Sequence, residues 1–226
     1  MTSARPRIYC SGPLFNDSER AEMAQIAAAL EAEGFDTFLP HRDGLEFRAL
    51  LADLMMAGLS IEDAQAAWDR AIFALDTYQA VEGCDAVVVN LNGRVPDEGA
   101  VAEAAMAWAR GRLVVGYKND VRSLVMGRDN AMVAGLVGFR VFSDPEAIAR
   151  GMRNVEWRMR NGERGTEPAH ESSFNIQPSP FSIPHSSGNA GSDVEAVIEL
   201  GRRIWADMNP VENLEGVAAT VMGMKN

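Results

Sequence analysis

Three carboxylates stand at the start of an alanine-rich segment, in the stretch VPDEGAVAEAAMAWARG at residues 95–111. Asp97 and Glu98 precede Gly99, where acids satisfy free amides and complement the dipole of a helix that begins there, typically for ~0.3 to 1 kcal/mol. Helix capping alone accounts for those two acids. Glu103 follows Gly99 by one helical turn, its alanine neighbours leave room around it, and the same dipole favours the ionised form that a carboxylate nucleophile requires.

Two further groups have the chemistry of a catalytic partner. Asp76 falls in the last turns of a predicted helix, where a carboxylate is unfavourable with the helix dipole. Solvent exposure and a functional role both explain it. Tyr9 alternates with Ile8 and Cys10 in a predicted strand, where a buried core tyrosine is the more frequent case. The residues alone leave both alternatives open.

Several enzyme classes are excluded by motifs that the chain lacks. Ser11 has no G-x-S-x-G context for a hydrolase nucleophile, and neither a P-loop nor a G-x-G-x-x-G fingerprint occurs. Cys10 and Cys84 are far apart and the histidines are scattered, so the chain has no metal-ligand spacing. We expect reduced, buried cysteines, no metal and no cofactor.

The composition predicts a soluble domain that takes a small neutral or cationic ligand. The chain has 226 residues, of which 47% are hydrophobic, enough to bury a sizeable core. Its formal net charge of -11 offers no basic face to displace counterions, which argues against nucleic acid and against an anionic membrane surface as partner. No apolar run is long enough to span a bilayer and the first residues lack a secretory signal, so we expect a cytoplasmic protein.

Apolar runs alternate with helical patterns in the first part of the chain. Short strands are predicted at residues 7–11, 35–40, 85–91, 112–117 and near 140, with helices between them. The helix before the third strand is expected to start at Ser60, which resembles a capping residue, and to run as one long helix to Gly83. This pattern predicts an α/β fold, a doubly wound five-stranded parallel sheet with the flavodoxin-like order. Ligands of such sheets bind beyond the carboxyl ends of the strands, so the loops after the first, third and fourth strands are the expected site.

The composition changes near residue 161. Residues 161–192 are rich in Ser, Pro, Gly and Asn with little periodicity, and we interpret them as a flexible linker or excursion. Helical spacing of apolar residues returns in DVEAVIELGRRIWADM. We therefore expect an α/β domain at residues 1–160 and a C-terminal helical tail at 193–226 that packs on the domain or on a neighbouring subunit.

Four ordered blocks resemble the nucleoside 2-deoxyribosyltransferase family over roughly the first 145 residues. They are IYCSGPLF, IFALDTYQAVEGCDAVVVNLNG, VPDEGAVAEAAMAWARGRLVVGY and RDNAMV. Members of this family exchange the base of 2'-deoxyribonucleosides through a covalent deoxyribosyl-enzyme intermediate on a glutamate. The resemblance implies 2'-deoxyribonucleosides and free nucleobases as ligands, no cofactor, and a homo-oligomer with shared active sites.

The resemblance also implies roles for individual residues. Glu103 is the implied nucleophile, Tyr9 the hydroxyl that orients it, and Asp76 the acid/base group that faces the nucleobase. The implied substrate-binding residues are Asp97 for the sugar 5'-hydroxyl, Phe15 for the base, Asn130 for the 5'-hydroxyl in a neighbouring subunit's site, and Ser11, Gly12, Gly99 and Met132.

The chain departs from the family pattern at several positions. Residues 99–101 read Gly-Ala-Val where Gly-Thr-Ala is usual, Ala105 replaces a glycine, and Asn92 replaces a frequent aspartate. In related nucleotide N-glycosidases a serine usually matches Asp97, whose charge favours nucleosides over 5'-monophosphates. Two alternatives stay open: an N-glycoside hydrolase of a nucleoside or nucleotide, and a catalytically silent binding module with the same fold.

Overall fold

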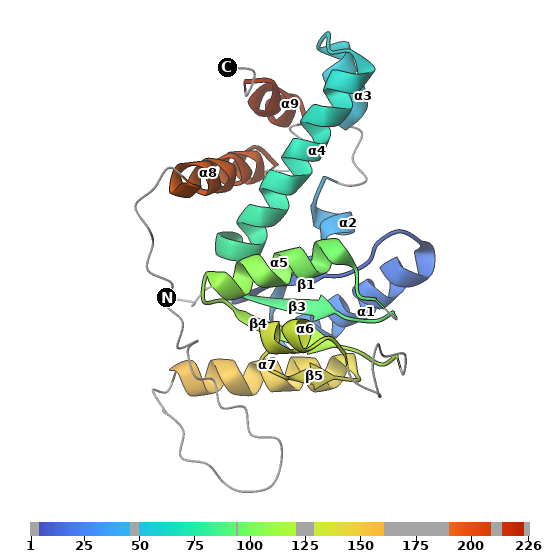
Figure 1. The fold of residues 1–226 in the computed structure, drawn as a ribbon, viewed down its shortest axis with the longest axis vertical. Coiled ribbons are helices and arrows are strands. Elements are labelled where there is room, and N and C mark those ends of the chain that lie inside the picture. The colour runs from blue at the N-terminus through green and yellow to red at the C-terminus, as the bar shows by residue number, and fades with distance from the viewer. Residues whose placement is uncertain are drawn as a thin grey trace, which may run out of the picture.

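The computed structural model describes residues 5–45, 50–93, 95–120, 129–160, 190–208 and 214–223. A five-stranded sheet lies at its centre (Figure 1). Its strands are β1 Arg7–Ser11, β2 Asp36–Phe38, β3 Ala86–Asn90, β4 Leu113–Tyr117 and β5 Val141–Phe142. All pairs are parallel and the order is β2-β1-β3-β4-β5, which confirms the predicted flavodoxin-like sheet.

Helices follow or precede every strand. They are α1 Asp17–Ala32, α2 Pro40–Asp43, α3 Leu50–Met56, α4 Ile61–Tyr78, the π-helical turn η1 Gln79–Gly83, α5 Glu98–Ala109, α6 Ala131–Leu136, α7 Pro145–Arg160, α8 Ala190–Met208 and α9 Leu214–Met222. Within the described ranges, none of these helices has the length and hydropathy needed to cross a membrane.

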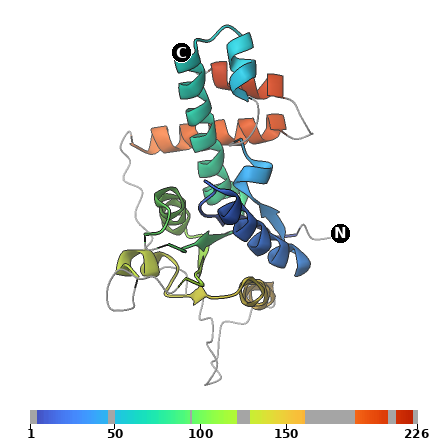
Figure 2. The same cartoon turned by 90° about the vertical axis from the view of Figure 1, so that its right-hand side faces the viewer.

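Two separate apolar layers cover the sheet. On one face, α1 and α7 pack on a row that includes Ile8, Cys10 and Val88. On the other face, α4, α5 and α8 pack on the row that includes Tyr9 and Val87 (Figures 1 and 2). Successive side chains of a strand point to opposite faces, so the nearly continuous apolar runs of the central strands serve both layers.

The end of α4 differs from the single long helix predicted up to Gly83. The predicted start is present, because Ser60 caps α4 by accepting a hydrogen bond from the Asp63 amide at 3.1 Å. The regular helix ends at Tyr78, and the chain widens into η1 before β3. A Cβ at Gly83 would lie 2.4 Å from the Gln79 side-chain oxygen, so a glycine is needed where the turn folds back.

The C-terminal helices form a second group around α4. Figure 1 shows α4 rising away from the sheet, with α3 and α9 beside its far half and α8 packed against it nearer the sheet. This agrees with the helical tail expected at residues 193–226, although α8 already begins at Ala190. Most of the predicted linker lies outside the described residues, because the structure describes none of residues 161–189.

Gly201 sets the distance between α8 and α4. A Cβ at this position would lie 2.1 Å from the Ala74 carbonyl oxygen and 2.5 Å from the Tyr78 Cβ. The two helices therefore touch backbone against backbone. On either side of this contact, the buried Ile198 and Ile204 insert into the shared core.

We predict that Gly201→Ala destabilises the protein. The methyl group forces α8 away from α4, and overpacking of this kind costs about 1–3 kcal/mol. For a chain of this size, that corresponds to a fall in Tm of roughly 2–12 °C, measured by thermal unfolding followed by circular dichroism. Gly135→Ala on α6 is the matched control, because its Cβ would meet nothing within 4 Å. Equal Tm values for the two variants would contradict the close contact between the helices.

Candidate active site

The carboxylate of Glu103 meets two hydroxyl groups of β1. The Tyr9 hydroxyl donates to Glu103 Oε1 at 2.9 Å, and the Ser11 hydroxyl donates to Oε2 at 2.5 Å. Both donors are fully buried, whereas Glu103 is half-buried. Residues two apart on a strand share one face, which is why β1 presents both hydroxyls to α5. Neutral donors on both oxygens favour the ionised carboxylate.

The first turn of α5 has the capping arrangement expected of its acids. Asp97 is the N-cap, and its Oδ1 accepts a hydrogen bond from the Ala100 amide at 2.8 Å. Glu98 begins the helix and is exposed. Gly99 lies against the cap, since a Cβ there would stand 3.2 Å from Asp97 Oδ1. Asp97 therefore stabilises the helix that carries Glu103, whatever else it contacts.

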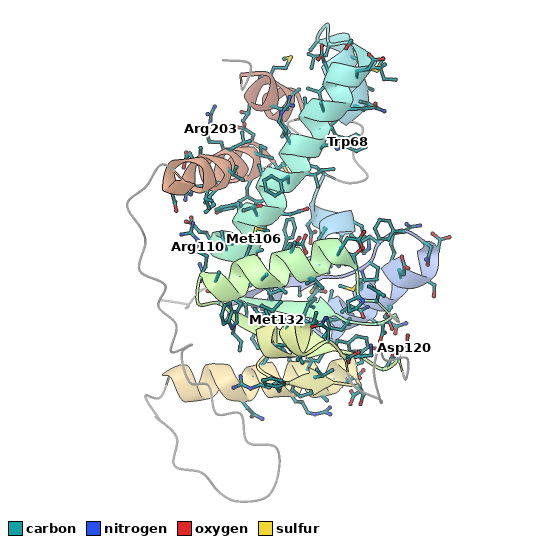
Figure 3. All side chains as sticks on the ribbon, in the orientation of Figure 1. Trp68, Met106, Arg110, Asp120, Met132 and Arg203 are labelled. Atoms are coloured by element: carbon teal, nitrogen blue, oxygen red, sulfur yellow. The ribbon has the colours of Figure 1, made fainter. Side chains whose placement is uncertain are left out.

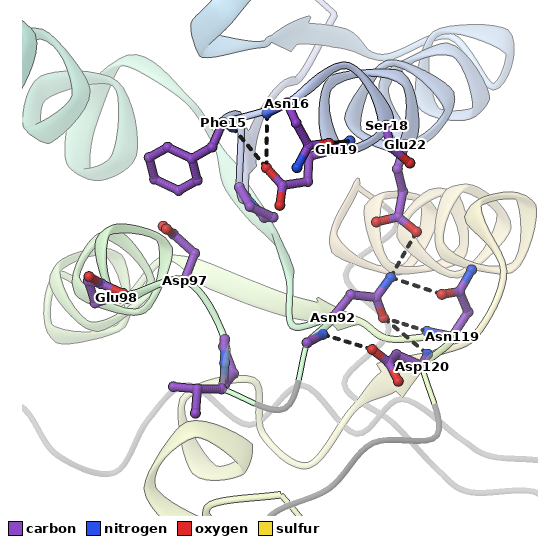
Figure 4. A pocket seen from close by; sticks show the side chains of 14 residues that line it. Phe15, Asn16, Ser18, Glu19, Glu22, Asn92, Asp97, Glu98, Asn119 and Asp120 are labelled. Carbon is purple, nitrogen blue, oxygen red and sulfur yellow. Dashed lines mark hydrogen bonds between the residues drawn. The ribbon is translucent and has the colours of Figure 1, made fainter.

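A pocket of about 700 Å³ opens beyond the carboxyl ends of the central strands (Figure 4). Three segments form its wall: the loop after β1 with the start of α1, the loop after β3, and the loop after β4. These are the three loops that the sequence indicates. The lining residues are Pro13, Phe15, Asn16, Ser18, Glu19, Glu22, Asn92, Gly93, Val95, Pro96, Asp97, Glu98, Asn119 and Asp120.

The lining of this pocket is acidic. Its charged members are the carboxylates of Glu19, Glu22, Asp97, Glu98 and Asp120, and within the described part of the chain no lysine or arginine joins them. Phe15 is the aromatic member and is 80% exposed. A neutral or cationic ligand with an apolar face matches this lining, and a phosphorylated ligand would face like charges.

A network of amides that the sequence did not reveal fixes the wall of the pocket. Asn92 donates to Glu22 at 2.8 Å, and its side-chain oxygen accepts from the backbone amides of Asn119 and Asp120 at 3.0 and 3.1 Å (Figure 4). An aspartate at position 92 would bring a second carboxylate to Glu22. Asn92 avoids this repulsion, because its side-chain amide donates a hydrogen bond to Glu22.

A buried cation completes this wall. The Lys118 side chain is 8% exposed, donates to the carbonyl oxygens of Leu91 and Gly93 at 3.1 and 3.3 Å, and pairs with Asp129 at 2.9 Å. Asp129 directly precedes Asn130, the N-cap of α6. Lys118 thus joins the loop after β3 to the start of α6. No spacing in the sequence points to this role.

Asp76 lies in the last turn and a half of α4, among buried neighbours. The residue is half-buried and its Oδ1 is shielded from solvent, so the surface alternative for Asp76 does not describe its position. Leu75 and Thr77 on either side are buried. α4 packs against α5, the helix that carries Glu103. Asp76 is not among the residues that line the pocket of Figure 4.

The remaining predicted residues lie at different places around the site. Gly12 follows β1 and packs closely, since a Cβ there would lie 2.5 Å from the Met23 sulfur. Asn130 is exposed, and its side-chain oxygen accepts from the Met132 amide at 2.9 Å. Met132 lies on α6 (Figure 3), and its side chain is 78% exposed. Among the described residues, neither Asn130 nor Met132 lines the pocket.

The two cysteines are buried and free, as expected. Burial raises the pKa of Cys10 to about 12, and it also raises the pKa of Cys84. Both thiols therefore stay protonated at neutral pH and are poor nucleophiles. The described residues contain no cluster of three or more His, Cys, Asp or Glu side chains placed to hold a metal ion.

Fold and site together define a class of protein. It is a doubly wound α/β protein with a pocket at the carboxyl edge of the sheet and, on α5, a carboxylate held by two strand hydroxyls. Among the described residues, Glu103 and its donors Tyr9 and Ser11 do not line this pocket, whereas Asp97 at the start of the same helix does. Residues 8–144 match the family model described as nucleoside 2-deoxyribosyltransferase, and the chain belongs to this family. No protein with a curated description matches the chain in sequence.

A solved structure with a TM-score above 0.5 shares the fold. A conserved protein from Enterococcus faecalis V583 superposes with a TM-score of 0.51 at 20% identity, covering 67% of this chain and 99% of its own. A 2-desoxiribosyltransferase from Leishmania mexicana matches with a TM-score of 0.32 at 18% identity, covering 53% of this chain and 69% of its own. The helices α8 and α9 lie beyond the residues that the family model matches.

We predict that Asn90→Asp destabilises the wall of the pocket. Asn90 is fully buried and donates to Glu22 Oε2 at 2.8 Å, whereas an ionised aspartate would repel Glu22 and donate nothing. The loss should be about 2–4 kcal/mol in urea unfolding at neutral pH. It should shrink near pH ~4, because a protonated carboxyl can donate.

The matched control for this measurement is Asn130→Asp. Position 130 is an exposed N-cap, where aspartate serves as well as asparagine. The control should change the free energy of unfolding by only a few tenths of a kcal/mol. A loss at Asn90 no larger than this would show that the buried contact with Glu22 contributes little.

Proposed function

We propose that the protein exchanges the base of 2'-deoxyribonucleosides through a covalent deoxyribosyl intermediate on Glu103. The observation that carries the proposal is the geometry at Glu103, whose two carboxylate oxygens each accept a hydrogen bond from a buried hydroxyl of β1. This arrangement lies within the residues matched by the family model. A carboxylate held ionised and oriented in this way is suited to attack an electron-deficient carbon.

The proposed reaction has two displacements at the anomeric carbon. First, a Glu103 oxygen forms an ester bond to C1' while the bond from C1' to the base nitrogen breaks, and that electron pair leaves with the base. Asp76 supplies the proton that neutralises the departing base. Next, a nitrogen of the acceptor base attacks C1', the ester bond breaks, and the proton of the acceptor passes to Asp76. Two inversions retain the configuration at C1'.

The placement of the other residues supports their proposed roles. The exposed ring of Phe15 at the pocket offers a face on which a base can stack. Asp97 keeps one oxygen on the helix cap and lines the pocket, where it can accept a hydrogen bond from the sugar 5'-hydroxyl. Asn130 and Met132 are exposed on α6, so we propose that they complete the site of a neighbouring subunit in a homo-oligomer.

We predict that Glu103→Ala abolishes base exchange while the fold is retained, because among the described residues no other acid accepts hydrogen bonds from Tyr9 and Ser11. The assay incubates deoxyinosine or thymidine with and without adenine and separates the products by chromatography. A new deoxynucleoside establishes transfer, and free base without an acceptor establishes hydrolysis instead. Glu146→Ala, an exposed acid in the first turn of α7, is the control and should keep full activity. Near-normal turnover by Glu103→Ala would exclude the covalent mechanism.

We predict that the enzyme uses deoxyadenosine in preference to its 5'-monophosphate. The phosphate would approach Asp97 in a pocket that already holds several carboxylates. A repulsion of about 1.4 kcal/mol is enough for a ten-fold ratio of kcat/KM, and like charges in a partly desolvated site exceed it.

Asp97→Ser removes the negative charge at position 97 but keeps the helix cap, because serine is also a good N-cap residue. The variant should narrow the ratio of kcat/KM between nucleoside and monophosphate, with little change in Tm. Equal or better use of the monophosphate by the unmodified enzyme would refute the proposed role of Asp97.

A further inference from the structure

A chain of ring contacts links the C-terminal helix α8 to Glu103. Tyr9 stacks on Phe38 of β2 with ring centroids 5.5 Å apart, and Phe38 meets the ring of Trp205 edge-on at 5.6 Å. Tyr9 and Phe38 are paired residues of adjacent strands, so their stacking follows from the register of the sheet. Trp205 comes from α8 and is half-buried. The ring path therefore runs from Trp205 through Phe38 to Tyr9, whose hydroxyl donates to Glu103.

Side chains on one face of β1 contact both Trp205 and Glu103, the two ends of this path. Arg7, Tyr9 and Ser11 alternate along the strand and share a face. The Arg7 guanidinium lies over the Trp205 ring at 5.1 Å, while the hydroxyls of Tyr9 and Ser11 hold Glu103. β1 therefore provides both donors to the Glu103 carboxylate and also contacts α8 through Arg7.

The position of Trp205 is itself tightly determined. Gly201 seats α8 directly on the α4 backbone, one turn before Trp205. The adjacent Ile204 is fully buried in the core shared with Tyr9 and Phe38. Arg202 pairs with Glu82 and lies over the Tyr78 ring at 5.7 Å. These contacts hold the Trp205 ring behind Phe38, rather than leaving it at a surface.

We propose that Trp205 is a positioning residue for the reaction, which acts through Phe38 and Tyr9 to hold the Glu103 carboxylate in its attacking orientation. The inference rests on the proposed function of Glu103. Trp205 lies outside the residues matched by the family model, so the chain has recruited its C-terminal extension to support the site. Without the Trp205 edge, Phe38 can tilt outward, and the Tyr9 ring that stacks on it gains freedom to turn its hydroxyl away from Glu103.

The kinetic test compares Trp205→Leu, Trp205→Phe and the control Val221→Ala in the full chain, well below the Tm of each. Trp205→Leu keeps apolar bulk on α8 but lacks an aromatic edge, and it should lower kcat about ten-fold with little change in KM. Trp205→Phe should restore kcat to within about three-fold of the unmodified enzyme. Val221→Ala removes buried atoms from α9, which contributes no ring to the path, and it should keep its kcat.

A double-mutant cycle separates positioning from simple stability. If Trp205 acts through the Tyr9 hydroxyl, Trp205→Leu should cost little further kcat in a Tyr9→Phe background. A full and independent loss in that background would overturn the inference, as would a kcat for Trp205→Leu equal to that of Val221→Ala. Phe38→Leu breaks the same path from β2, and it takes the place of Trp205→Leu in the comparison if that variant does not fold.

A measurement without substrate distinguishes this inference from the proposed function. The chain has three tyrosines, so 3-fluorotyrosine labelling gives three ¹⁹F resonances, and Tyr9→Phe identifies that of Tyr9. Trp205→Leu should shift or broaden the Tyr9 resonance, and Val221→Ala should leave it unchanged. If the unmodified protein neither transfers nor releases a base, the proposed function fails while this result still decides the ring path. An unchanged Tyr9 resonance in Trp205→Leu would overturn the inference.

Discussion

The site depends on one requirement, that a half-buried carboxylate on α5 must find hydrogen-bond donors in place of lost water. Glu103 obtains them from Tyr9 and Ser11, which are two residues apart, so a strand aims both hydroxyls at one face. β1 therefore lies inside the sheet, between β2 and β3, on the face that α5 covers. The helix start beside the pocket and the loops after β1, β3 and β4 follow from the same arrangement, because the carboxyl ends of parallel strands share one edge.

The asparagines in the wall of the pocket offset the repulsion among the carboxylates that line it. Carboxylates crowd the opening, and the asparagines beside Glu22 supply donors where further acids would repel it. Lys118 offers the loop carbonyls a buried positive charge and is matched by Asp129, so the cation is screened from the pocket. The result is a hydrogen-bonded wall beside an acidic opening. Like-charge repulsion at such an opening disfavours an anionic ligand.

Local patterns in the sequence were sufficient to predict the sheet and its helices, because apolar runs and helix caps such as Ser60 depend on residues close together in the chain. They also singled out Glu103, whose position after a glycine on a small-residue helix is a local feature. The ties of Ser11 to Glu103 and of Asn92 to Glu22 join positions 92 and 70 apart in the chain, so no periodicity reveals them. The π-helical turn after Tyr78 and the docking of α8 on α4 were missed for the same reason, since both depend on tertiary packing.

The docking of α8 on α4 has a consequence for the order in which the chain folds. Arg202 and Glu82 are paired across 120 positions, and the surrounding helix contact is equally distant in sequence. During synthesis, β1 to β4 and their helices emerge well before α8, and until then the apolar side of α4 around Ala74 faces water. Closing so long a loop is slow, because its entropy must be lost before the contact forms. Until α8 docks, the newly made α/β domain therefore exposes an apolar face of α4, and exposed apolar surface of this kind promotes aggregation and chaperone binding.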